Sequence, residues 1–215
     1  MSSQEHQKLE KVGQGSAEGD QRNVDHDSPI QKLVSAYRFI AIYHRGDETN
    51  DSDPYINHVI EVTHILASAG VTDVDVLCAG LFHDIKDVDI DMITDFGDKV
   101  KSIVKDYSFG KELHGSQRKQ YQLENISDMS NDIKLIKLAD ILTMLRDNSG
   151  TYDESDEAQR GHVLWEYLMC KSIEGVNEYL DQQLAIIFTA LELDKLSSEE
   201  VMSRLVEYYT YMDNK

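Results

Sequence analysis

The sequence has few basic residues, few prolines and cysteines, and no long hydrophobic run. Its 21 lysines and arginines stand against 40 aspartates and glutamates, for a net charge of −19. A surface this acidic repels phosphate backbones and anionic lipids, so neither nucleic acids nor membranes are expected partners. No apolar run approaches the roughly 18 residues that span a bilayer, and the first residues lack the apolar segment of a signal peptide. We therefore expect an intracellular protein of the cytoplasm.

Signals for strands and disulfides are also scarce. The two cysteines, Cys78 and Cys170, lie inside apolar helical patterns, which favours buried free thiols in a reducing compartment. Runs of alternating valine, isoleucine and threonine are missing, whereas apolar residues recur at spacings of three and four. This pattern predicts an all-α domain. The expected helices cover residues 30–44, 56–69, 73–87, 90–95, 97–107, 116–126, 131–148, 156–176, 178–192 and 198–212.

The chain divides into three expected segments. Residues 1–28 hold almost no large apolar side chains and predict a disordered polar tail. Residues 29–195 form the main domain, in which the almost uniformly apolar segment after Asp73 predicts a central buried helix. Residues 196–215 begin with the Ser-x-x-Glu pattern of a capping box. They predict a final amphipathic helix that packs on the domain or on a partner.

Polar residues on the most apolar helices predict a metal site. His83 and Asp84 end the central helix, where burying a carboxylate without a partner is strongly unfavourable. His58 and Asp140 lie on two other helices with apolar faces. A single His–Asp pair is more often a hydrogen-bonded helix pair, but four such residues favour a shared ion. Mixed nitrogen and oxygen ligands suit Mn²⁺, Mg²⁺ or Fe²⁺ better than structural Zn²⁺, and the pattern is typical of a catalytic site.

The order and spacing of these four residues resemble those of the HD-domain metal phosphohydrolases. Further segments are similar to the RelA/SpoT-type hydrolase domain, in particular to the small single-domain SpoT homologs of metazoans. The similarity covers about residues 30–190. It is carried by HR at 44–45, DPYINH at 53–58, AGLFHD at 79–84, DFGDKV at 95–100, RKQYQLENI at 118–126 and KLADILTMLRD at 137–147.

The resemblance implies an all-α HD-domain bundle around a single Mn²⁺ ion held by His58, His83, Asp84 and Asp140. It implies a hydrolase that removes pyrophosphate from the 3′ position of guanosine tetraphosphate (ppGpp), leaving GDP, by attack of a metal-bound water on phosphorus. Asp87 would be the catalytic carboxylate that handles this water. The residues expected to bind the nucleotide are Arg45, Lys137, Thr143 and Arg146, with Lys111, Arg118 and Lys119 as further candidates.

Several positions depart from the family pattern. Asp87 stands where the family has glutamate, on the same expected helical face as His83, and Val88 replaces the second catalytic carboxylate. The loop 46–53 is acidic where the family is basic. Three hypotheses therefore stay open: a ppGpp pyrophosphohydrolase, an HD phosphatase for a less charged nucleotide such as NADPH, and a catalytically weak module. The last would sense a nucleotide, or would bind a protein partner or a second copy of the chain through its C-terminal helix.

Overall fold

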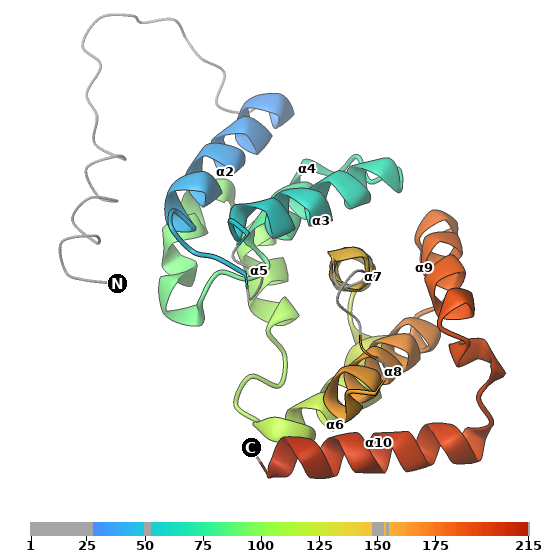
Figure 1. Ribbon diagram of the computed structural model, residues 1–215. Helices are drawn as coiled ribbons and strands as arrows, with labels where there is room; N and C mark the ends of the chain where they lie inside the picture. Colours follow the sequence, from blue (N-terminus) through green and yellow to red (C-terminus); the bar gives the residue numbers. More distant parts are fainter. Residues whose placement is uncertain (1–27, 50–52, 148–152, 154, 215) are drawn as a thin grey trace, which may run out of the picture.

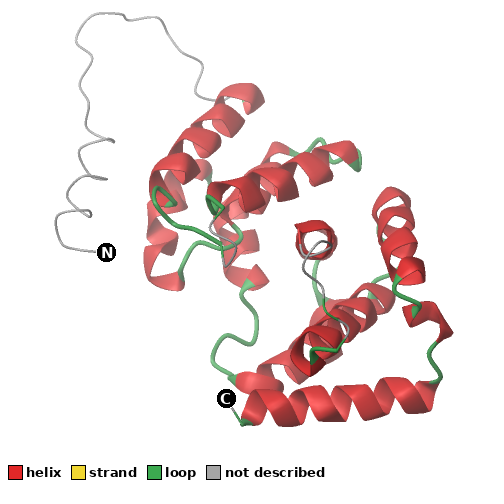
Figure 2. Cartoon of the chain, viewed as in Figure 1, coloured by secondary structure: helices red, strands yellow, loops and turns green. Residues whose placement is uncertain are grey.

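The computed structural model of the protein describes residues 28–49, 53–147, 153 and 155–214, so the tail predicted at 1–28 lies almost entirely outside the described residues. The described chain is built from α- and 3₁₀-helices (Figure 2). It also contains an isolated β-bridge between Glu48 and Pro54. This architecture confirms the all-α prediction. The α-helices are α2 (Pro29–Tyr43), α3 (Ile56–Ser68), α4 (Val74–Phe82), α5 (Asp98–Tyr107), α6 (Gly115–Asn125), α7 (Asn131–Asp147), α8 (Glu157–Ser172), α9 (Glu178–Ala190) and α10 (Ser198–Asp213). The 3₁₀-helices are η1 (Asp87–Phe96), η2 (Ile126–Asp128) and η4 (Leu193–Lys195).

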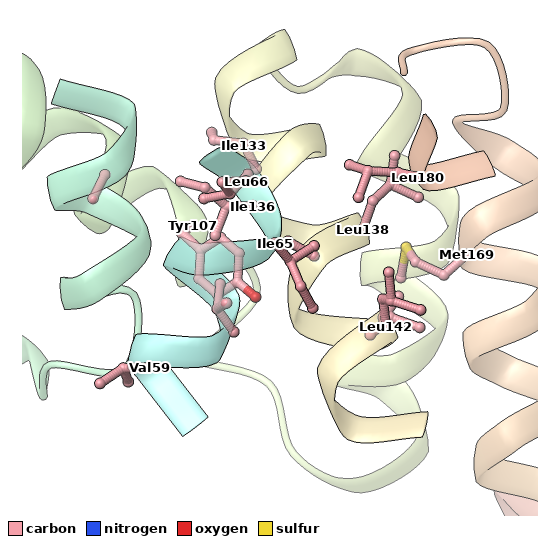
Figure 3. Packing of buried hydrophobic residues seen from close by; sticks show 14 of the residues in the cluster. Val59, Ile65, Leu66, Tyr107, Ile133, Ile136, Leu138, Leu142, Met169 and Leu180 are labelled. Carbon is pink, nitrogen blue, oxygen red and sulfur yellow. The ribbon is translucent and has the colours of Figure 1, made fainter. Parts of the chain in front are cut away.

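Helix α7 lies between two groups of helices (Figure 1). On one side it contacts α3, α4 and α5, and on the other it contacts α8 and α9. Figure 3 shows part of this packing, with Ile65 of α3, Leu142 of α7 and Met169 of α8 among the buried side chains. Because α7 packs on both groups, a side chain from its middle can reach residues of either one.

Helix α4 is the central buried helix that the sequence predicts. Every residue from Val76 to Phe82 is buried. Asp73 caps the helix as predicted, and its carboxylate accepts a hydrogen bond from the backbone N–H of Asp75 at 2.9 Å. Gly80 allows α3 to come close, because a Cβ at this position would lie 2.7 Å from Cδ1 of Leu66. The C-terminal half of α4 is therefore enclosed by its neighbours.

The end of α4 differs from the prediction. The sequence predicts a helix to residue 87, but α4 ends at Phe82 with His83 as its C-cap. The backbone of Lys86 is extended, and its N–H donates to the hydroxyl of Tyr43 at 3.3 Å before η1 begins at Asp87. Residues 83–87 contain no glycine or proline that would mark the end of the helix in the sequence. What accompanies this end is a contact with Tyr43 of α2, which a local sequence pattern does not reveal. The prediction that Asp87 shares a helical face with His83 is therefore wrong.

Helix α10 begins with the predicted capping box, in which Ser197 and Glu200 each bond to the other's backbone. The helix then runs along α8 and α6, and it contacts both (Figure 1). The division of the chain at residues 28 and 195 stays a prediction.

Both cysteines are buried and free, Cys78 on α4 and Cys170 on α8, as the sequence predicts. Burial raises the pKa of the Cys78 thiol to about 12, so this thiol stays protonated and unreactive near neutral pH. Separately, every helix in the described part of the chain is too short or too polar to cross a membrane.

Candidate metal centre

Four residues from three parts of the bundle meet at one place, with both histidines buried and Asp84 partly exposed. His58 lies in the first turn of α3, His83 is the C-cap of α4, and Asp140 lies halfway along α7. Asp84 follows His83 where the chain leaves α4. Since α7 contacts both α3 and α4, the packing of these helices brings together the four residues that the sequence predicts as ligands.

The donor atoms are close enough to share one ion. Nε2 of His58 and Nε2 of His83 lie 3.4 Å and 3.7 Å from Oδ1 of Asp140. Oδ2 of Asp84 lies 3.1 Å from Nε2 of His83 and 3.7 Å from Nε2 of His58. Ligands that share an ion at about 2.1 Å lie about 3–4 Å apart, so this spacing fits one divalent cation.

A buried nitrogen in this cluster faces two carboxylate oxygens without a hydrogen bond to either, an arrangement that suits a metal ligand. Nδ1 of His83 lies 2.8 Å from the carbonyl oxygen of Gly80, which can only accept, so Nδ1 carries a proton. Nε2 of His83 is buried and makes no hydrogen bond with the described residues, which is costly for a polar atom. Metal-binding histidines usually donate their other ring N–H to such a carbonyl. The cluster therefore fits a divalent metal.

Three further side chains hold the two aspartates in place. The hydroxyl of Tyr107 donates to Oδ2 of Asp140 at 2.6 Å, and Nζ of Lys137 donates to the same oxygen at 3.1 Å. The hydroxyl of Tyr55 donates to Oδ2 of Asp84. These bonds fix the orientation of both carboxylates and leave Oδ1 of Asp140 facing the histidines. Sequence reasoning missed both tyrosines, because no pattern distinguishes them from core aromatic residues.

The charges of the cluster favour a bound cation. Burial opposes protonation of His83, but the carboxylates of Asp84 and Asp140 outweigh it and raise the pKa of His83 to about 9. Burial also acts to raise the pKa of Asp140, yet Lys137 and the histidines hold it well below its usual value. The pKa of Asp84 is likewise lowered by His83, against the effect of burial. Two carboxylates that stay ionised beside buried imidazoles create a negative potential that stabilises a proton or a metal ion.

A cavity of about 500 Å³ borders the cluster, with walls that also come from α6, α8 and α10. Its lining includes three lysine or arginine side chains, Lys137, Arg118 and Lys119. Nζ of Lys119 lies 3.5 Å from the ring centre of Trp165. Burial lowers the pKa of Lys119 to about 8, although the carboxylate of Glu166 acts in the opposite direction. The volume and the cations suit a small anionic ligand such as a nucleotide.

The other four residues named as substrate-binding candidates, Arg45, Lys111, Thr143 and Arg146, do not line this cavity. Thr143 is fully buried, and its hydroxyl donates to a backbone carbonyl one turn earlier at 3.0 Å. Arg146 lies six residues after Asp140, about 240° further round the helix, and it donates to Oε1 of Gln183 at 2.9 Å. Arg45 is exposed after the end of α2. Of the candidates, Lys137 contacts the metal cluster directly, and Arg118 and Lys119 line the cavity beside it.

The segment predicted to handle the attacking water is described in part. The side chain of Asp87 lies outside what the structure describes, so its catalytic role stays a prediction. Val88 is 89% exposed. The carboxylate of Asp89 is buried and accepts a hydrogen bond from the hydroxyl of Tyr43 at 2.9 Å. Asp89 is therefore engaged by α2 and does not stand in for the carboxylate that Val88 replaces.

The fold and the site together define a class of protein. A helical bundle that brings His58, His83 and Asp140 close enough to hold a metal ion, with Asp84 beside His83, agrees with the HD-domain fold that the sequence resemblance implies. The family model for the HD domain matches residues 36–168 of this chain. The chain therefore belongs to the HD-domain family, in the group that includes the SpoT-type pyrophosphohydrolases called MESH1.

Relatives in that group show how far the similarity extends. The chain is 35% identical to human guanosine-3′,5′-bis(diphosphate) 3′-pyrophosphohydrolase MESH1 over 170 residues, which cover 75% of this chain and 95% of the relative. The identity to the Drosophila melanogaster protein of the same name is also 35%, over 74% of this chain and 94% of the relative. A solved structure of a metazoan ortholog of SpoT that hydrolyzes ppGpp gives a TM-score of 0.67 at 30% identity, and the match covers 74% of this chain and 94% of that one.

Proposed function

We propose that this protein is a metal-dependent hydrolase that converts ppGpp to GDP and pyrophosphate. The observation that carries the proposal is the cluster of two histidines and two aspartates around the buried Nε2 of His83, at the edge of a cavity lined by cations. The activity for which the MESH1 relatives are named supports the choice of ppGpp as substrate.

The proposed metal is a single Mn²⁺ ion held by His58, His83, Asp84 and Asp140. When bound, it supplies a Lewis acid that offsets phosphate charge and makes water more acidic. Tyr55 and Tyr107 keep the two carboxylates oriented, so the ligand geometry persists while the substrate enters. The carbonyl of Gly80 keeps the proton of His83 on Nδ1, away from the substrate.

The substrate's pyrophosphate would contact Lys119, Arg118 and Lys137, the lysine and arginine residues that line the cavity. A water oxygen forms a bond to the phosphorus attached to the 3′-oxygen, and the bond between that phosphorus and the 3′-oxygen breaks. The 3′-oxygen takes a proton and leaves as the hydroxyl of GDP, while pyrophosphate keeps the attacking oxygen. In this proposal Asp87 accepts the proton that the water loses.

Release of pyrophosphate from ppGpp in the presence of Mn²⁺ tests the proposal. Asp84→Ala should lower turnover by about 100-fold or more, because it removes a ligand and the bond from Tyr55. The matched variant Asp91→Ala changes an exposed aspartate that pairs with Lys101, and it should keep wild-type turnover. Equal turnover in all three proteins would refute the metal site, and no turnover in any of them would refute ppGpp as the substrate.

A second candidate substrate is a less charged nucleotide such as NADPH. The buried carboxylate of Glu166 lines the cavity and repels phosphate groups, whereas Arg45 and Arg146 do not line it. These features reduce the positive charge available to a substrate with four phosphates. Higher kcat/KM for NADPH than for ppGpp would favour this candidate. Nucleotide binding with turnover no higher than in Asp84→Ala would instead favour the sensing hypothesis.

A further inference from the structure

Helix α10 contributes to the cavity although it lies outside residues 36–168, which the HD-domain family model matches. It runs along α8 and α6, and its C-terminal end lies beside the start of α6 (Figure 1). Met212, in the last turn of α10, is one of the residues that line the cavity. The cavity of this chain therefore has a wall that the matched HD domain does not include.

Two contacts fix α10 to the helices that carry the cavity's cations and its tryptophan. The carboxylate of Asp213 accepts hydrogen bonds from the backbone N–H of Ser116 at 3.1 Å and from its hydroxyl at 2.9 Å. Ser116 is buried in the first turn of α6, two residues before Arg118. A shift of α10 at this point would therefore move the start of the helix that carries the cations.

The second contact joins α10 to α8. Tyr208 is 3% exposed, and its hydroxyl lies 3.2 Å from Nδ1 of His162, a residue that also lines the cavity. The helices approach closely because position 161 is a glycine, where an added Cβ would lie 2.5 Å from Cβ of Tyr208. This close packing places α10 beside the turn of α8 that carries Trp165.

The chemistry of this wall differs from that of the metal cluster. Met212 presents a polarizable thioether, which suits a flat, apolar group rather than a phosphate. The ring of Trp165 is buried beneath Lys119 and supports this wall from behind. Lys119 and Arg118 supply positive charge to the same cavity. A nucleotide has both kinds of group, with phosphates at one end and a base at the other.

We propose that α10 completes the nucleotide-binding site: Met212 contacts the base of the nucleotide, and Asp213 is a positioning residue that acts through Ser116. This inference rests on the proposed function, since it takes a nucleotide to be the ligand. It assigns base recognition to a helix that the family model does not cover.

Fluorescence of Trp165 provides a binding test that does not depend on turnover. It is the single tryptophan of the chain and lines the cavity. The wild type, with Mn²⁺ present, is titrated with GDP and separately with inorganic pyrophosphate. Met212→Ala should raise the Kd for GDP about fivefold to tenfold and leave the Kd for pyrophosphate unchanged. The matched variant Met202→Ala, at a 60% exposed position of the same helix, should change neither value.

The role of Asp213 is tested in the same titration. Asp213→Ala removes both bonds to Ser116 and should weaken GDP binding, whereas Asp213→Asn keeps an oxygen that accepts from the backbone N–H and should restore it. Failure of the asparagine variant to restore GDP binding would overturn the positioning role.

Three results would overturn the assignment of Met212. These are equal Kd values for GDP in the two methionine variants, equal weakening of GDP and pyrophosphate in Met212→Ala, or no change in wild-type fluorescence with GDP. Failure of the proposed hydrolysis would appear separately, as absent pyrophosphate release from a protein that still binds GDP.

Discussion

Metal binding should stabilise the fold, and Asp140→Asn should remove most of that stabilisation. Asp140 contributes the oxygen that faces both histidines, at 3.4 Å and 3.7 Å. At a free Mn²⁺ concentration 100 times Kd, binding adds about 2.7 kcal/mol to the unfolding free energy. For a chain of this length that raises Tm by about 5–10 °C. If the lost ligand raises Kd about 100-fold, the same Mn²⁺ concentration adds only about 0.4 kcal/mol, or about 1 °C.

The assay is thermal unfolding with and without Mn²⁺, and each variant is compared with itself, so any loss of stability in the metal-free protein cancels. The matched control is Asp132→Asn, the same substitution on the same helix at a residue that pairs with Lys99 at 3.6 Å. It should keep the full metal-dependent rise in Tm. An equal rise in Asp140→Asn and in the wild type would refute the assignment of Asp140 as a ligand, and no rise in any protein would refute the site.

Three further predictions concern the cavity and its surroundings. Because burial lowers the pKa of Lys119 to about 8 and only its charged form attracts phosphate, raising the pH from 7 to 8.5 should raise the Kd for GDP about fourfold. Lys119→Arg, which stays charged, should flatten this dependence, and an equally steep rise in that variant would contradict the assignment. Gly161→Ala should destabilise the protein by about 1–3 kcal/mol in urea unfolding through its clash with Tyr208, while Ser172→Ala, at an exposed position of the same helix, should have little effect. Val88→Asp should leave pyrophosphate release unchanged, since position 88 is 89% exposed, and a clear gain in turnover would show that this segment reaches the substrate.

The sequence predicts a helix boundary well where a neighbouring residue, such as a capping side chain, determines that boundary. Asp73 caps α4 and the capping box begins α10, as their side chains predict. The end of α4 is different, because the chain leaves the helix where Lys86 meets Tyr43 of α2. Residues so far apart in sequence form no pattern within a window of one helix. The periodicity therefore continues past Phe82, although the helix does not.

The clustering of the four residues predicted as metal ligands was predictable for a physical reason that the predicted substrate residues lack. A histidine or aspartate on an apolar helix has a burial cost that demands a partner, so such residues stand out in the sequence. Threonine and arginine carry no such signal, since Thr143 bonds to its own helix and Arg146 bonds to Gln183. The sequence gives no signal that Met212 lines the cavity, because the amphipathic pattern of α10 predicts a buried face without showing what that face covers.

The exposure of Val88 bears on how fast the protein can hydrolyse its substrate, because it limits which residues of the segment 87–89 can take part in proton transfer. Val88 has no carboxylate and is exposed, and the carboxylate of Asp89 is bonded to Tyr43, so neither residue supplies a carboxylate to the cavity. In the proposed mechanism, Asp87 is then the one carboxylate of this segment left to accept the proton. A positioned general base contributes about 10²–10⁴-fold to a rate, so an ill-placed Asp87 would slow hydrolysis within that range. The dependence on Asp84 would remain, since its bonds to His83 and Tyr55 do not involve that segment. Slow turnover that is still lost in Asp84→Ala is therefore the signature of a working site with a weak base, whereas turnover that Asp84→Ala leaves intact would place the chemistry elsewhere.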